Sequence, residues 1–222
     1  MRADRRRLAE ALEAGAKTRA GDWGGEVSVW HTWIRDLIVQ SPTGQVIGGT
    51  QVVQKDNVGD GYAYGVELRA ERALTDAWTA IVTAAWMASK VDQFKPDGTK
   101  IEKPLSRNMP ATARLAARCE PPEEDWWFEA DVLAADTGDK LSLRDEGDTE
   151  RIPPGGTPGF AVFGIRGGVR VGERSRMTLA LENVFDKNYR YHGAGINFFY
   201  LPRTTSIAVI PVSSQDSPFI FN

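Results

Sequence analysis

Residues 62–70 read Tyr-Ala-Tyr-Gly-Val-Glu-Leu-Arg-Ala, with an apolar or aromatic side chain at every second position. The positions between them are small or charged. Successive side chains of a β-strand point to opposite faces, so this period of two predicts a strand with one apolar and one polar face. The pattern returns at residues 78–90, where Trp78, Val82 and Trp86 share one face and two threonines lie between them. The sequence therefore predicts a protein built mainly of two-faced strands.

The same period predicts nine strands, and their connections alternate strictly between short and long. The predicted strands are 10–20, 26–39, 62–74, 78–90, 110–119, 126–136, 160–171, 175–186 and 203–210. The short connections are 21–25, 75–77, 120–125 and 172–174, and the long ones are 40–61, 91–109, 137–159 and 187–202. Short turns alternating with long loops are typical of bacterial outer-membrane barrels, whose crossing strands need ~9–11 residues. Residues 46–55 are expected to form a hairpin arm inside the first long connection.

The spacing of two tryptophans agrees with a membrane crossing. Trp78 and Trp86 are eight residues apart, which is ~26 Å along a strand at ~3.3 Å per residue. A tilt near ~45° reduces this to a height of ~19 Å, comparable with the ~25 Å apolar band of such barrels. His31 shares the apolar face with Val27, Val29 and Trp33, so we interpret it as an interfacial residue and not as a metal ligand.

The opposite face carries a row of charges. Its members are Glu67, Arg69, Glu71, Arg114, Arg118, Glu129, Asp131, Arg166 and Arg170. In a membrane barrel these side chains would line a hydrated lumen, where charges stay solvated or paired. In a soluble β-rich binding module, the alternative interpretation, they would form the surface and the tryptophans the core.

Composition excludes several other classes. The chain has 222 residues, 41% hydrophobic residues and a net charge of −3, and no run approaches the ~20 apolar residues of a membrane helix. Its single cysteine, Cys119, excludes an internal disulfide and a cysteine metal cluster. The basic start at Met1–Arg7 is not followed by an apolar segment, so no signal peptide is expected, and a pI of about 5.5 disfavours nucleic-acid binding. No catalytic arrangement, paired metal ligands or phosphate-binding loop is recognisable, so we expect no enzyme activity, resident metal or cofactor.

Three segments, in order, resemble one protein family. Residues 181–190 read Leu-Glu-Asn-Val-Phe-Asp-Lys-Asn-Tyr-Arg, followed by a Gly-rich stretch and by Pro202-Arg203. This closely resembles the N-[LV]-F-D-x-x-Y segment that enters the last loop of TonB-dependent receptors. Residues 30–38 are similar to an aromatic strand of that family ending in Asp-Leu-Ile, and residues 64–68 to its G-[VI]-E strand.

The resemblance implies the C-terminal part of an outer-membrane receptor. The fold implied is an antiparallel up-and-down transmembrane β-barrel, of which this chain supplies about nine to ten of ~22 strands. The function implied is energy-coupled uptake of a scarce nutrient, such as a ferric siderophore, haem or cobalamin. The implied partners are outer-membrane lipid, the metal chelate and the TonB complex, which would act through a plug domain that this sequence lacks. A passive, porin-like channel is the membrane-bound alternative.

Because the sequence lacks the plug domain of the family, we expect it to correspond to the C-terminal part of the barrel. We expect a basic stub at 1–9, the barrel portion at 10–210 and a tail at 211–222, in a chain that is a fragment of a multi-pass outer-membrane protein. Within the motif, the resemblance implies structural roles for Asn183, Phe185, Asp186, Tyr189, Pro202 and Arg203. Asp186 and Asn188 are expected to bond local backbone groups near the strand end. The candidate ligand-binding residues, in the predicted outer loop, are Tyr189, Arg190, Tyr191 and His192.

Overall fold

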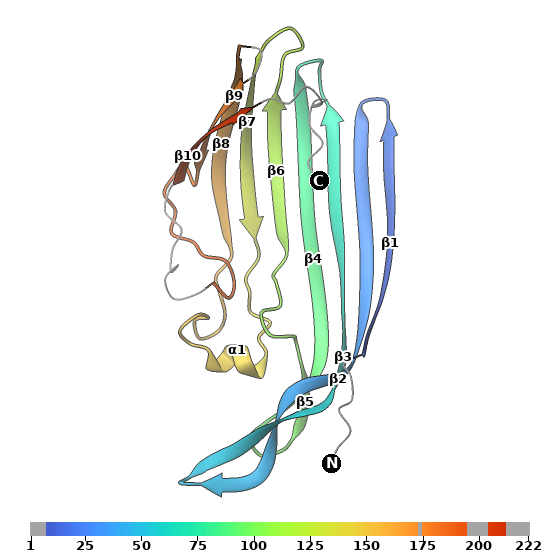
Figure 1. Cartoon of the computed structure of the whole chain (residues 1–222), viewed down its shortest axis with the longest axis vertical. Coiled ribbons are helices and arrows are strands. Elements are labelled where there is room, and N and C mark those ends of the chain that lie inside the picture. The colour runs from blue at the N-terminus through green and yellow to red at the C-terminus, as the bar shows by residue number, and fades with distance from the viewer. Residues whose placement is uncertain (1–7, 173–174, 195–203, 212–222) are drawn as a thin grey trace.

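One antiparallel sheet of ten strands makes up nearly all of the structure (Figure 1). The computed structural model describes residues 8–172, 175–194 and 204–211. Nine strands follow one another in chain order across the sheet, each paired with its sequence neighbour, in the order β1-β2-β3-β4-β6-β7-β8-β9-β10. The tenth, β5, pairs only with β4. In the described residues, β1 and β10 are the two ends of this path and the sheet is open between them.

The elements have the following bounds. The strands are β1 Leu8–Ala20, β2 Trp23–Ile47, β3 Thr50–Ala73, β4 Trp78–Phe94, β5 Lys100–Lys103, β6 Thr112–Cys119, β7 Trp126–Ala135, β8 Phe160–Val171, β9 Ser175–Glu182 and β10 Thr204–Pro211. One helix, α1 Leu143–Gly147, lies between β7 and β8. No helix in the described part of the chain is long and apolar enough to cross a membrane. The nine predicted strands correspond to the nine strands of the path, whereas β5 and α1 were not predicted.

The second and third strands are much longer than predicted, because they continue outward as a two-stranded arm. The arm is paired as far as Ile47 and Thr50 around a Gly48–Gly49 turn, both glycines having positive φ. This confirms the hairpin expected at residues 46–55. Register shifts between Ile34 and Leu37 mark the place where the arm leaves the regular ladder. Figure 1 shows it curving away beyond the end of the sheet.

The two ends of the sheet differ in their connections. Short turns lie at one end, and the arm, β5 and α1 all lie at the other (Figure 1). Because neighbouring strands are antiparallel, the predicted alternation places all short connections at one end of the sheet and all long ones at the other. Strand β9 ends at Glu182 and not at the predicted residue 186, because Asn183 has a φ of 53° and turns the chain out of the extended conformation.

The outer face carries aromatic residues in two groups. Trp23, Trp78 and Trp126 each begin a strand directly after a short turn. The second group lies toward the long connections and consists of His31, Trp33, Tyr62, Tyr64 and Trp86, with ring centroids of successive contacts 4.2–6.1 Å apart. Two aromatic belts separated by aliphatic side chains are the pattern of a lipid-facing barrel wall. A soluble sandwich would cover this face with a second layer, and the described strands form only one (Figure 1).

On the inner face, two tryptophans lie flat against glycines. The indole of Trp127 occupies the space where a Cβ on Gly168 would stand, and Trp30 does the same above Gly65. The guanidinium of Arg118 lies over the Trp127 ring, 4.4 Å from its centroid. Each glycine lets a large ring lie along the neighbouring strand, which fills the inner surface without pushing the strands apart.

Candidate functional site

The inner face holds a network of ion pairs. Arg114 on β6 pairs with Glu129 and, at 3.1 Å, with Asp131, both on β7. Arg166 on β8 reaches the same two carboxylates, each at 3.2 Å. Two arginines therefore share two carboxylates across three neighbouring strands, and Glu129 is only 5% exposed. Four of the nine residues predicted to line the inner face thus neutralise one another, which stabilises their charges away from bulk water.

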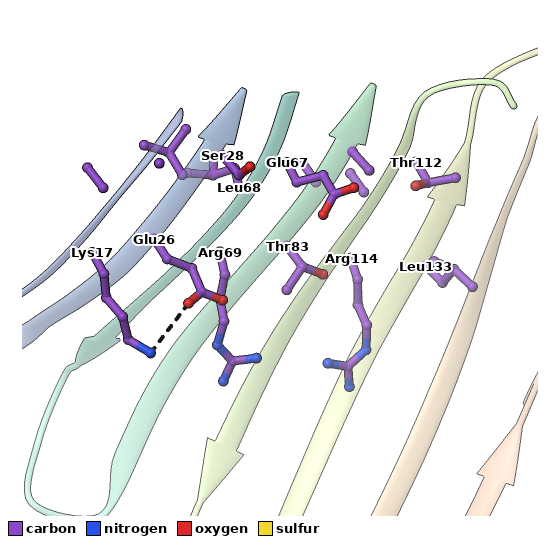
Figure 2. A pocket seen from close by; sticks show the side chains of 16 residues that line it. Lys17, Glu26, Ser28, Glu67, Leu68, Arg69, Thr83, Thr112, Arg114 and Leu133 are labelled. Atoms are coloured by element: carbon purple, nitrogen blue, oxygen red, sulfur yellow. Dashed lines mark ion pairs between the residues drawn. The ribbon is translucent and has the colours of Figure 1, made fainter. Parts of the chain in front are cut away.

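A broad hollow lies beside this network (Figure 2). It has a volume of about 700 Å³ and crosses the inner face from β1 to β7. Its wall mixes alanines with charged side chains, and Lys17 of β1 pairs with Glu26 of the neighbouring β2 at 3.5 Å. Figure 2 shows Arg69 and Arg114 extending from this wall on the same side. The hollow therefore offers both charged and apolar side chains on the inner face.

At the end of the sheet opposite the short turns, three long connections pack against one another. We call them loop A (residues 95–111), loop B (136–159) and loop C (183–194). Loop B carries α1, which begins with a capping box: the Ser142 hydroxyl accepts from the Asp145 backbone N–H, and the Asp145 carboxylate accepts from the Ser142 N–H. The helix has only five residues, so its cap and its contacts with loop A, more than its length, hold it in place.

Asp145 joins loop B to loop A. Its carboxylate accepts hydrogen bonds from the Ser106 hydroxyl at 2.7 Å and from the Arg107 backbone N–H at 3.0 Å, and the residue is 2% exposed. Burial raises the pKa of this carboxyl, but the hydrogen bonds from Ser106, Ser142 and Arg107 outweigh it, so the pKa lies below its ordinary 3.8. Asp145 is therefore a buried, charged hub between the two loops.

Further contacts support the same junction. The Gln93 side chain accepts from the Leu143 N–H at 2.9 Å and donates to the Pro104 carbonyl at 2.8 Å. Lys103 pairs with Glu146 at 2.6 Å. Strand β4, loop A and α1 are thus connected by side chains from all three.

The motif at residues 183–189 forms the turn that starts loop C. The Asn183 amide group donates to the Lys187 carbonyl and accepts from the Lys187 N–H, both at 2.9 Å. Asn183 thus closes the turn, a role that was not predicted for it, and the backbone bonds predicted for Asp186 and Asn188 stay a prediction. The Asp186 N–H bonds back to the Asn183 carbonyl, and Phe185 stands outward, 72% exposed, against the ring of Phe163. Pro202 and Arg203 lie outside the described residues.

The four candidate ligand-binding residues divide into two kinds. Tyr189 is buried in a cluster with Phe160 and Val162, and His192 is 7% exposed. Tyr191 is 40% exposed, and Arg190 and Tyr191 line a small cavity between the loops. Burial raises the pKa of both tyrosines, so their hydroxyls remain protonated donors at neutral pH. His192 lines the same cavity from its buried position, so Arg190 and Tyr191 are the two more accessible members of the set.

Sequence analysis missed the junction residues. Asp145, Ser106 and Gln93 are far apart along the chain, and each lies in a segment that was expected to be an irregular loop. One signal was present: Ser142-Leu-Arg-Asp145 has the spacing of a capping box, with Asp where Glu or Gln is usual.

Comparison with known proteins agrees with this architecture. A family described as "TonB dependent receptor-like, beta-barrel" matches residues 8–184. No sequence among the curated proteins matches the chain significantly.

Solved structures with the same fold include two metal transporters and one import receptor. The copper transporter OprC is 21% identical with a TM-score of 0.65, and the match covers 91% of this chain and 30% of that one. The FrpB iron transporter from Neisseria meningitidis (F3-3 variant) is 19% identical with a TM-score of 0.64, covering 91% and 31%. The ferric-catecholate import receptor Fiu from E. coli K12 is 17% identical with a TM-score of 0.59, covering 91% and 27%.

These likenesses concern the fold, and the chain spans about 30% of the length of the first two solved chains. The family match covers well over half of the 222 residues and includes most of the wall, from β1 through β9. Members of this family are transport receptors and not enzymes. The chain belongs to the TonB-dependent receptor family, as part of its β-barrel domain.

Proposed function

We propose that this chain forms part of the wall and outer loops of an outer-membrane receptor that captures a scarce nutrient, most simply a metal chelate. The observation that carries the proposal is the combination of a two-faced wall with one end built up from loops A, B and C. The outer face suits lipid, the inner face suits a hydrated occupant, and the loops offer a surface to the medium. OprC is a copper transporter, FrpB an iron transporter and Fiu a ferric-catecholate import receptor, which supports this class of cargo.

Within the loops, we assign ligand contact to Arg190 and Tyr191. A guanidinium only donates hydrogen bonds, and a protonated phenol can donate its O–H, so both suit the oxygen atoms of an anionic chelate. Tyr189 and His192, buried beneath them, hold this part of loop C in place. Transport itself would need a plug domain inside the barrel and the TonB complex acting on it, and the hollow of the inner face is the surface that such a domain would cover.

The test uses the full-length receptor that contains this chain, in a strain lacking its other TonB-dependent receptors. Binding and uptake are measured with radiolabelled ferric siderophores, haem and cobalamin. We expect one of these to bind, Arg190→Ala and Tyr191→Ala each to weaken binding about tenfold, and uptake to stop when TonB is deleted while binding persists. Exposed Asp139→Ala in loop B is the control. Solute passage that is independent of TonB and insensitive to both substitutions would instead favour a passive channel.

A further inference from the structure

His192 is the residue that seats loop C on the base of loop B. Gly138 and Thr157 close that base as an isolated bridge, with N–H···O distances of 2.9 and 3.2 Å. The His192 ring lies directly on Gly138, so that a Cβ there would come within 2.5 Å of its Nδ1. Nδ1 also lies 3.1 Å from the Thr157 hydroxyl. One imidazole thus contacts both residues of the bridge.

The other ring nitrogen has no partner. Nε2 of His192 is buried and makes no hydrogen bond within the described part of the chain. In a neutral ring, one nitrogen forms a hydrogen bond with the Thr157 hydroxyl and the other, uncharged nitrogen has no partner. This missing hydrogen bond has a moderate free-energy cost. A protonated ring carries two N–H donors and a positive charge, and the second donor would point into a site without an acceptor. The contact therefore tolerates only the neutral imidazole.

We propose that His192 is a proton-sensitive latch: it holds loop C on loop B while the imidazole is neutral and releases loop C when the imidazole is protonated. Released residues include Arg190 and Tyr191, so acid would disorganise the candidate ligand surface. The latch itself rests on the contacts above, whereas its effect on a bound nutrient rests on the proposed function.

The charges around the imidazole come from each neighbouring element. Asp145 of α1 favours the protonated form and Arg190 of loop C opposes it, and burial, the largest effect, lowers the pKa below its ordinary 6.5. Asp136 and Tyr191 line the same small cavity, and Arg107 of loop A packs against Gly193. The Asp145 carboxylate is already occupied by three donors from loops A and B, so it is a poor acceptor for a protonated His192.

The direction of the pH effect follows from the lowered pKa. Above pH 6.5 the imidazole is neutral in both the closed and the released loop, and the latch is at full strength. As the pH falls below 6.5, the released loop takes up a proton that the closed loop does not. The opening constant then rises up to tenfold per pH unit until the closed form is protonated as well.

Hydrogen–deuterium exchange in the ligand-free full-length receptor tests this. Amide exchange of residues 190–194 is followed between pH 7.5 and 5, corrected for its intrinsic pH dependence. We expect the opening constant to rise as the pH falls below 6.5, by up to tenfold per pH unit, with no comparable change in β3 or β4. His192→Gln, which can bond Thr157 but cannot titrate, is expected to abolish the pH step. His31→Gln, which changes the chain's only other histidine, is expected to retain it.

Two results would overturn the latch: protection that does not change with pH in the unaltered protein, or a pH step that survives in His192→Gln. If the Gln variant opens loop C at every pH, exchange of the imidazole C2 proton in the unaltered receptor decides the matter. A pKa for His192 at or above 6.5 would contradict the latch, and a lower one would support it. Because no ligand is present, these outcomes are independent of whether the proposed nutrient is correct.

Discussion

Replacement of Asp145 by alanine is expected to separate loops A and B while leaving the sheet intact. The carboxylate accepts from Ser106, Arg107 and Ser142 at 2.7–3.2 Å. Hydrogen bonds to a charged group contribute about 1.5–3 kcal/mol each. Ser106 and Arg107 are exposed, so water can replace part of the hydrogen bonding that the carboxylate provides. We therefore expect Asp145→Ala to lower the stability of the junction by about 3 kcal/mol. At 1.4 kcal/mol per factor of ten, that corresponds to a roughly hundredfold rise in local opening.

The assay is amide exchange of loops A and B in the full-length receptor at pH 7.5. Asp145→Asn retains one acceptor oxygen and should show a smaller increase than Asp145→Ala. Asp139→Ala removes an exposed carboxylate from the same loop and should have no effect. A change below threefold in Asp145→Ala, or an equal change in the Asp139 control, would refute the hub.

The same carboxylate predicts a pH limit for the junction. Its pKa in the folded protein is below 3.8, so its contribution is fully present above pH 3.8 and is lost as the pH falls further toward the lower value. Measured in the His192→Gln background, which removes the step below pH 6.5, protection of residues 106–107 should persist to about pH 4 and then fall. Loss of that protection already at pH 5 would contradict the assigned contacts.

Three further predictions concern the wall and the motif. Gly168→Ala should displace the Trp127 indole and destabilise the barrel in urea by about 1–3 kcal/mol, whereas Gly147→Ala, with open space around it, should not. Val82→Arg, on the outer face, should lower the stability of the folded protein in lipid vesicles by about 2–4 kcal/mol. Thr83→Arg, on the inner face, should lower it by less than about 1 kcal/mol, and equal losses in the two variants would contradict the assigned faces. Asn183→Ala should lose both bonds to Lys187 and increase exchange of residues 184–189 about tenfold, and an unchanged rate would argue against its role in the turn.

The sequence predicted the wall well because the wall is governed by alternation. Residues 62–70 and 78–90 have one apolar side, and a one-residue slip in register would place charges among apolar neighbours. The long connections were less predictable. Strand β5 has only four residues and α1 only five, too few for a periodic signal. The arm extends past Pro42 and Gly44, residues that usually interrupt a strand.

The candidate site was predicted as a set of neighbours along the chain, and its role in ligand binding stays a prediction. Residues 189–192 do lie together at the loop end of the sheet. The burial of Tyr189 and His192 could not be foreseen, because it depends on Phe160 and Thr157, which lie about 30 residues away in sequence. Asp145 was missed for the same reason, since its partners Ser106 and Arg107 belong to another loop.

The central claim is that one face of this sheet meets lipid and the other a hydrated interior. Spin labels at Leu68 and Val82, and at their neighbours Arg69 and Thr83, test it directly in the full-length receptor in native outer membrane, with Cys119 changed to Ser. We predict that oxygen dissolved in lipid relaxes the labels at Leu68 and Val82, and that a water-soluble nickel chelate relaxes those at Arg69 and Thr83. Labels on all four positions that respond alike, or in the reverse order, would contradict the account.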